Sequence, residues 1–472
     1  MSAARVTGSF RDPSGYVFAH EGRIFRAVDA HCHSALGELA AAGLLEKFIR
    51  ERQVVATRFV EDPALLEQFA AAHPGYSQFL EHERLDHITF PYEWTVAMLA
   101  DAALLTLDLQ IALAGAGFAL KDATAYNIQF REGRPIFIDL SSIQRPKRRD
   151  VWFALGQFQR HFLFPLLLAV KRGWDLRSYF LANLDGIGPS QVLANFRGLS
   201  RWSPAVLLDL TVPAMLESKA STGKAKTWEE SQEKPAGDAS AQIINLKRLR
   251  RKVASLARGY RTSGAWHDYT ATCTYDDEAE ASKKKLIAAF LGEVKPRTVL
   301  DVGCNSGDYS YLAAEHGASV IAADADHDSV ELLHHRLREK PAKITALVVN
   351  AANPSPAIGY MNTERASFLD RFAGAPDCVF ALALIHHLLV SANLSLAHIR
   401  DLFATLTARW LVLEFVPTGD VQFQRLIQFR ENLFAGITLA ACLDVLGERF
   451  TVLAQQPVAG TERTLLFLEK RG

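Results

Sequence analysis

Apolar and polar positions follow different patterns in the two halves of the chain, on either side of a polar stretch at residues 217–242. This stretch contains one large apolar residue, Trp228, so it cannot bury enough surface to offset the entropy of ordering, and we expect a flexible linker. Before it, alternating runs predict a β-hairpin at 16–28, and helical spacing dominates after residue 152. A strand-containing part followed by a helical part predicts an α+β domain with two lobes over residues 1–216.

Strands and helices alternate in the last part of the chain, from residue 283 to residue 472. This alternation predicts an α/β fold with a largely parallel, Rossmann-like sheet, closed by an antiparallel pair. We expect seven strands, at 298–302, 319–323, 344–349, 378–384, 410–415, 450–453 and 464–468.

Residues 243–282 are expected to form a helical segment and a lid between the linker and this last domain. The segment opens with a basic helix at 243–260, for which two interpretations stay open: a solvated face covering the next domain, or a docking surface for an anionic partner. Trp266 and Tyr269 follow the helix, and either fold over a ligand as a lid or pack against the first helix of the domain.

Composition narrows the functional classes. Lys plus Arg and Asp plus Glu are 52 each, so the formal charge is zero, which argues against a protein dedicated to nucleic acid. The five cysteines form no C-x-x-C pair, which argues against a disulfide framework or a cysteine zinc site. No apolar run approaches the ~20 residues of a membrane helix. We therefore expect a cytoplasmic protein without a membrane contact.

A glycine-containing turn follows the first strand of the last domain and is the strongest chemical signal. The run Val299–Gly307 carries an acid, two glycines and Asn305 where the chain turns towards a helix, a pattern that lets the backbone approach a ligand closely. Asp324 ends the second strand, where an acid can accept the hydroxyls of a ribose. The turn lacks the G-x-G-x-x-G of nicotinamide-binding proteins.

This combination of loop, acid and strand series resembles the class I S-adenosylmethionine-dependent methyltransferases. The resemblance implies S-adenosylmethionine as cofactor, bound by Asp301, Gly303, Asn305, Gly307, Asp324, Asn350 and Ala351. It also places the acceptor site beside His386 and His387, which are expected at the end of the fourth strand. One of them could act as general base, or both could be hydrogen-bonded structural histidines. Glu414, at the end of the fifth strand, either positions the acceptor or caps the next helix.

The amino-terminal half contains a second motif, in which Asp122 and Asn127 precede a strand, a turn and a second strand that runs up to Asp139. The spacing D-x-x-x-x-N and the later acid resemble the catalytic and metal-binding loops of the protein-kinase-like fold. The resemblance implies that Asp122 accepts the proton of a hydroxyl and that Asn127 and Asp139 hold Mg²⁺ with ATP.

Other kinase parts are missing from the sequence, because no glycine-rich loop precedes the hairpin and no V-A-I-K strand is present. The strand residues Arg26 and Arg58 are the alternative candidates for contacting phosphate. Two hypotheses therefore stay open: a nucleotide-binding phosphotransferase half, or a pseudokinase that docks a protein partner or the substrate. A hairpin with incidental Asp and Asn is a third.

Across nearly its whole length the chain resembles the NoeA-like nodulation-protein methyltransferases. The residues that carry this resemblance are 92–94, 120–123, 138–140, 184–187, 364–368 and 381–388. The resemblance implies a methyltransferase whose acceptor is an oxygen or nitrogen of a small molecule or glycan.

Overall fold

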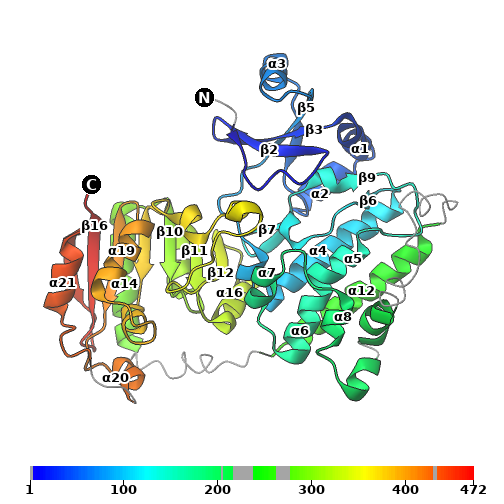
Figure 1. The fold of residues 1–472 in the computed structure, drawn as a ribbon. Coiled ribbons are helices and arrows are strands. Elements are labelled where there is room, and N and C mark those ends of the chain that lie inside the picture. The colour runs from blue at the N-terminus through cyan, green and yellow to red at the C-terminus, as the bar shows by residue number, and fades with distance from the viewer. Residues whose placement is uncertain (1–3, 204–205, 216–237, 262–276, 429–432) are drawn as a thin grey trace.

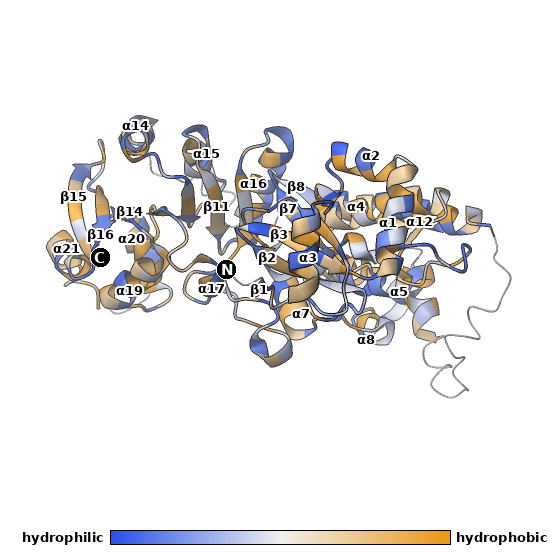
Figure 2. Cartoon of the chain, turned by 90° about the horizontal axis from the view of Figure 1, so that it is seen from above, coloured by the Kyte–Doolittle hydropathy of each residue, from blue (hydrophilic) through white to orange (hydrophobic). Residues whose placement is uncertain are grey.

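The computed structural model describes residues 4–203, 206–215, 238–261, 277–428 and 433–472. Figures 1 and 2, which view the molecule from perpendicular directions, both show the amino-terminal and carboxyl-terminal halves side by side. The predicted linker lies almost entirely outside the described residues, as do Trp266 and Tyr269, which the sequence proposed for a lid.

The first lobe of the amino-terminal half is a five-stranded antiparallel sheet with the order β1-β2-β3-β5-β4. The predicted hairpin is confirmed, since β2 and β3 pair from Gly15 opposite Val28 to His20 opposite Arg23. Four rings, Phe18, Phe25, Phe69 and Phe79, form the core between the sheet and α3. The elements are β1 Ala4–Arg5, β2 Gly15–His20, β3 Arg23–Val28, α1 Ala30–Ala41, α2 Leu44–Arg50, β4 Thr57–Phe59, α3 Pro63–Ala72 and β5 Gln78–His82.

The second lobe is built around α4, whose residues are mostly buried by the surrounding helices. This helix is long and apolar enough to cross a membrane by length and composition, a property that the core helices of globular domains share. Two short strand pairs, β6 with β9 and β7 with β8, lie beside it. The elements are α4 Val96–Gly115, β6 Ala119–Leu120, β7 Ile128–Arg131, β8 Arg134–Phe137, β9 Ile143–Gln144, α5 Leu155–Phe158, α6 Phe164–Arg172, α7 Leu176–Ala182 and α8 Pro189–Leu193.

The basic helix differs from the sequence expectation in its start and its packing. It is α12, Ser240–Gly259, and it packs on α4 and α6 of the amino-terminal half rather than on the carboxyl-terminal domain. Its apolar stripe, which includes Leu249 and Val253, belongs to the same core as α4. Arg248 and Lys252 bind Asp209, so part of the basic charge is neutralised within the chain. This pairing favours the interpretation as a packed helix with a solvated face.

The carboxyl-terminal half is an α/β fold with a seven-stranded mixed sheet in the order β12-β11-β10-β13-β14-β16-β15 (Figure 1). The first five strands are parallel, and β16 runs antiparallel between β14 and β15, as predicted. The strand order reverses between β10 and β13, which opens a crevice at their carboxyl ends. The strands are β10 Thr298–Val302, β11 Ser319–Asp324, β12 Ile344–Val348, β13 Cys378–Ala381, β14 Trp410–Phe415, β15 Phe450–Pro457 and β16 Thr464–Lys470.

Helices cover both faces of this sheet, and the sheet separates the two apolar cores that they form with it. The first of them, α14, already begins at Asp277, so this half starts before the predicted residue 283. The helices are α14 Asp277–Val294, α15 Asp308–Glu315, α16 His327–Glu339, α17 Phe368–Phe372, α18 Ile385–Val390, α19 Leu396–Leu406, α20 Val421–Ile427 and α21 Leu439–Gly447.

The two halves share a polar interface at the amino end of α4. The backbone N–H of Val96 donates to His327 Nε2 at 3.1 Å, and that of Ala97 donates to the buried carboxylate of Glu331 at 3.0 Å. Both acceptors belong to α16 of the carboxyl-terminal half. They satisfy N–H groups that the first turn of any helix leaves open, and the carboxylate also complements the helix dipole. One half therefore caps the core helix of the other.

Candidate functional site

The turn after β10, residues 303–307, forms a cradle whose backbone N–H groups are hydrogen-bonded within the chain. Gly303, Asn305 and Gly307 all have positive φ, at 79°, 49° and 85°. A Cβ on Gly307 would lie 2.5 Å from Leu333, so a side chain there is excluded by space as well as by conformation. Asn305 is the residue type that best tolerates this conformation apart from glycine, as the sequence indicated.

Asp324 fixes the shape of this turn. Its carboxylate accepts the backbone N–H of Asn305 at 2.8 Å and that of Asp326 at 2.9 Å. Burial raises the pKa of Asp324, and these backbone hydrogen bonds oppose the increase. The acid predicted to bind ribose therefore also ties the end of β11 to the loop after β10.

Asp301 is buried at the end of β10 and accepts a hydrogen bond from the hydroxyl of Ser310 at 2.6 Å. Burial raises the pKa of Asp301 to about 7, because it outweighs that hydrogen bond and the distant charge of Lys283, and Asp324 adds to the increase. A carboxyl group with this pKa gains free energy when a cationic ligand group approaches it.

The cradle opens into a cavity of about 770 Å³. This volume is in the usual range for small-molecule sites. The structure brings together most of the predicted cofactor residues and one of the two histidines at this cavity: Asp301, Gly303, Asn305, Asp324, Asn350, Ala351 and His387. Gly307, His386 and Glu414 do not line it. The size of the cavity and the two acids in its wall fit S-adenosylmethionine, because a carboxylate such as Asp324 can accept from ribose hydroxyls and one such as Asp301 can pair with an ammonium.

The two histidines lie on a helix and not at the end of a strand, because β13 ends at Ala381 and α18 begins at Ile385. Ala383, with a φ of 49°, turns the chain between the two elements. As a result the side chain of His386 is buried in the protein interior, whereas His387 lines the cavity. Burial, then the charge of Arg463, lowers the pKa of His387 below its ordinary value.

Glu414 neither contacts the cavity nor caps a helix, so both interpretations offered from the sequence were wrong. Its fully buried carboxylate pairs with Lys283 and with Arg463. The cap of α20 is Asp420, which accepts from the backbone of Gln422. Glu414 is thus a buried counter-ion behind the cavity wall.

Sequence reasoning missed the contribution of α14 and α15 to the cavity. Glu280 and Lys283 on α14 line it, together with Tyr309 on α15. The ammonium of Lys283 lies 4.7 Å from the centre of the Tyr309 ring. One signal was available, since Lys283 interrupts an apolar stripe at helical spacing.

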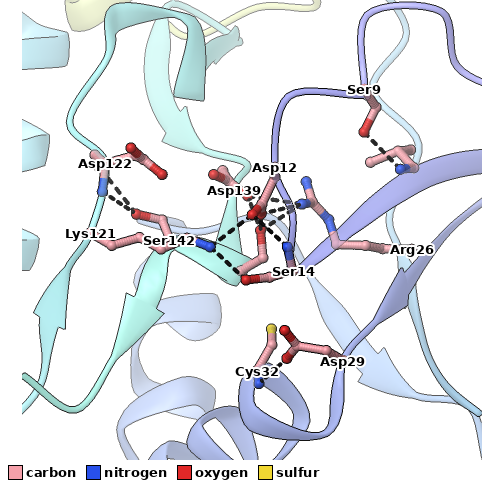
Figure 3. Close-up of polar contacts among 12 residues, drawn as sticks. Ser9, Asp12, Ser14, Arg26, Asp29, Cys32, Lys121, Asp122, Asp139 and Ser142 are labelled. Atoms are coloured by element: carbon pink, nitrogen blue, oxygen red, sulfur yellow. Dashed lines mark hydrogen bonds and ion pairs between the residues drawn. The ribbon is translucent and has the colours of Figure 1, made fainter. Parts of the chain in front are cut away.

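A second charged cluster lies between the sheet lobe and the helical lobe of the amino-terminal half (Figure 3). Asp12 lies in the loop before β2, and Lys121 donates to its carboxylate at 2.8 Å. Arg26 on β3 pairs with Asp139 at 3.0 Å and donates to Ser141 at 2.6 Å. The hydroxyl of Ser141 lies within hydrogen-bond distance of both Asp12 and Asp139.

This geometry bears on the predicted phosphate and metal sites. Arg26 reaches the cluster, whereas Arg58 pairs with Glu81 at 2.6 Å on the edge of the sheet. Asp139, predicted to hold Mg²⁺, is engaged by Arg26, and Asn127 has a buried Nδ2 without a partner among the described residues. The part of the chain that the structure describes contains no group of three His, Cys, Asp or Glu side chains arranged for a metal ion.

Asp122 remains close to this cluster. Its backbone N–H donates to the hydroxyl of Ser142 at 3.0 Å. Burial, followed by the charge of Asp139, raises the pKa of its carboxyl group. The charge of Asp139 thus affects the carboxyl group of Asp122, as the motif requires. Nothing in the described residues supports bound ATP or Mg²⁺.

Comparisons with known proteins place the whole chain. No family model matches it. The nodulation protein NoeA of Rhizobium meliloti (strain 1021) is 34% identical over 469 residues, which cover 99% of this chain and 96% of NoeA. The cypemycin N-terminal methyltransferase of a Streptomyces species is 36% identical over 74 residues, 15% of this chain and 30% of that protein.

Solved structures with weaker similarity include two methyltransferases. The match to the N-methyltransferase NodS of Bradyrhizobium japonicum WM9 covers 42% of this chain and 99% of the NodS chain, with a TM-score of 0.31 and 13% identity. The match to the bifunctional kinase-methyltransferase WbdD covers 44% of this chain and 43% of the WbdD chain, with a TM-score of 0.31 and 13% identity.

The full-length identity to NoeA, the strand order of the carboxyl-terminal sheet and the cofactor cradle agree with one another. The chain belongs to the family of the nodulation protein NoeA.

Proposed function

We propose that the chain methylates an oxygen or nitrogen atom of a small molecule or glycan, with His387 as the general base. The observation that carries the proposal is the position of His387 in the wall of the cofactor cavity, beside Leu384 and Leu388. The lowered pKa of His387 leaves its ring neutral near pH 7, where a neutral imidazole accepts a proton.

The division of labour between cofactor and protein follows from this arrangement. S-adenosylmethionine supplies a methyl group that its sulfonium already activates, so the protein mainly has to align the acceptor and exclude water. The residues of the β10 turn hold the cofactor end of the cavity. A hydroxyl or ammonium acceptor must also lose a proton, and a ring nitrogen of His387 takes it.

The test uses the purified full chain, S-adenosylmethionine and a panel of saccharides and small hydroxyl or amine compounds, with formation of S-adenosylhomocysteine as the signal. On the acceptor so found, His387→Gln should lower kcat by roughly 10²- to 10⁴-fold, the usual contribution of a general base, and leave cofactor affinity unchanged. His398→Gln, a change in the exposed first turn of α19, is the control. Equal rates of wild type and His387→Gln would exclude the base.

The pH profile of the same reaction adds an independent readout. Because the pKa of His387 lies below 6.5, the wild-type rate should be on its plateau at pH 7 and fall only at more acidic pH. The His387→Gln variant should lose that acidic limb. A wild-type rate that still rises steeply above pH 7 would assign the proton transfer to another group.

For the amino-terminal half we propose a non-catalytic role, as a module that presents the substrate or a protein partner to the methyltransferase half. The supporting observation is that Asp139 is held by Arg26 and that Lys121 is held by Asp12. Arg26 is the candidate for contacting phosphate and Asp139 the candidate for holding the metal, and the two already neutralise each other.

Calorimetric titration of Mg·ATP into the full chain separates this proposal from a phosphotransferase half. We expect no binding, whereas S-adenosylmethionine should bind in the same preparation. ATP binding that Asp139→Asn weakens would instead establish a nucleotide site.

A further inference from the structure

Lys283 occupies a position where a helix normally places an apolar residue. It lies on the buried stripe of α14, four residues after Ala279 and four before Ile287, and both neighbours are fully buried. The side chain of Lys283 is only 3% exposed. Lysine is almost never buried to this extent unless it is paired or meets a ligand.

The environment of Lys283 contains a charge network that reaches across the sheet. Glu414, at the end of β14, binds Lys283 and also faces Arg463 at 3.4 Å. Arg463 in turn donates to both carboxylate oxygens of Asp420, at 2.7 and 3.0 Å. Two cations and two anions therefore balance, and Glu414 would keep a cationic partner even without Lys283.

Stability alone does not account for this lysine. A buried ion pair adds little over well-packed apolar side chains of the same volume, because desolvation offsets the attraction. An apolar residue would continue the stripe of α14, whereas Lys283 brings a positive charge to the wall of the cofactor cavity. The positive charge of Lys283 also acts on Asp301 and lowers the pKa of its carboxyl group, although burial of Asp301 outweighs this effect.

The wall of the cavity therefore carries both an acid, Asp301 on β10, and a cation, Lys283 on α14. A zwitterionic amino acid group needs this pair, an acceptor for its ammonium and a cation for its carboxylate. We propose that Lys283 binds the α-carboxylate of S-adenosylmethionine, opposite Asp301 at the ammonium, and that Glu414 positions the lysine. The proposal rests on the assignment of this cavity to that cofactor.

A ligand that differs only in the carboxylate tests the proposal on the unaltered protein. Calorimetry with decarboxylated S-adenosylmethionine, which keeps the sulfonium, the ribose and the ammonium, should give an affinity roughly 10- to 100-fold lower than that of S-adenosylmethionine, the usual strength of a charge-assisted hydrogen bond. Equal affinities of the wild type for the two ligands would overturn the proposal. Failure of both ligands to bind would overturn the cofactor assignment as well.

A variant then identifies the residue responsible. Lys283→Met should weaken S-adenosylmethionine by the same roughly 10- to 100-fold and leave decarboxylated S-adenosylmethionine within about threefold, so the preference disappears. Lys284→Met, at the partly exposed neighbour that pairs with Glu280, should keep it. Lys283→Arg retains a cation and is the second variant should Lys283→Met fail to fold, and it should keep a preference for the carboxylate. If Lys283→Met weakens both ligands equally, the lysine is structural and the proposal fails.

Discussion

The two charged clusters of this protein contrast in how far each is satisfied by its own chain. In the amino-terminal cluster, burial raises the pKa of Asp12, but hydrogen bonds from Lys121, Ser14 and Ser141 outweigh burial and leave that pKa lowered. In the carboxyl-terminal cavity, burial outweighs the hydrogen bond from Ser310 and raises the pKa of Asp301 to about 7. The carboxylate of Asp12 is thus stabilised by a cation of its own chain, whereas that of Asp301 has no such partner among the described residues.

The difference distinguishes a structural cluster from a binding site. A charged group can contribute binding free energy only if no partner in the free protein already stabilises it. A group in a cavity whose pKa is strongly perturbed is therefore a candidate for ligand binding. Groups that neutralise one another contribute to the fold instead. We therefore expect substitutions in the amino-terminal cluster to change stability, and those at the cavity to change ligand affinity.

The largest effect is expected for Arg26→Met. This change leaves Asp139 without the cation that lies 3.0 Å away and should lower the free energy of unfolding by about 3–5 kcal/mol, the usual cost of breaking a buried pair. Urea denaturation measures it. Arg58→Met, which removes a largely exposed arginine from Glu81, should cost about 1 kcal/mol or less. If the two variants lose the same small amount, the amino-terminal cluster is not structural and the contrast fails.

Asp301→Asn should have the opposite character. In the proposed binding mode the carboxylate pairs with the cofactor's ammonium, so its loss should lower the affinity for S-adenosylmethionine roughly 10- to 100-fold in calorimetry. Binding of 5′-methylthioadenosine, which lacks the amino acid group, should change much less. Equal losses for the two ligands would show that Asp301 shapes the β10 turn rather than recognising charge.

The pH dependence of stability sharpens the same contrast. The pKa of Asp301 is about 7 when folded and 3.8 as the ordinary value, so between these pH values the folded state keeps a proton that the unfolded state has released. Stability from this group therefore falls as pH rises from about 4 to 7. Asp301→Asn removes the effect, and its free energy of unfolding should exceed that of the wild type at pH 8 by more than at pH 5. A constant difference would contradict the raised pKa.

Local sequence signals predicted the parts of the site that depend on neighbours along the chain. Six of the seven strands were visible because each is a mostly buried apolar run, and the turn at Gly303 and Gly307 because its shape needs those residues. The seventh, β15, is largely exposed, and only its apolar start at 450–453 was predicted. Asp324 was found from its place after the second strand. The histidines were assigned to a strand because the apolar run continues to Leu384, whereas Ala383 ends the extended conformation.

Long-range pairs could not be predicted in the same way. Lys283 meets Glu414 from 131 residues away, and Lys121 meets Asp12 from 109 residues away. A sequence pattern gives the type of each residue but not its partner, so Glu414 was interpreted as positioning the acceptor or capping a helix, and its pairing with Lys283 was missed. The basic helix was expected to cover the carboxyl-terminal half for the same reason, since an apolar stripe does not specify which core it joins.

The smallest expected effect concerns the boundary between the two regions, at Glu331. Glu331→Gln keeps the size of the side chain but replaces the carboxylate that accepts from Ala97 at the start of α4, and it should lower the free energy of unfolding by about 1 kcal/mol, the usual value of a helix cap with its dipole. Urea denaturation of the full chain measures this. Glu339→Gln, at the exposed end of the same helix, should change nothing. If the two variants are equally stable, the contact at the start of α4 does not stabilise the protein. The two halves are then held together only by their other contacts.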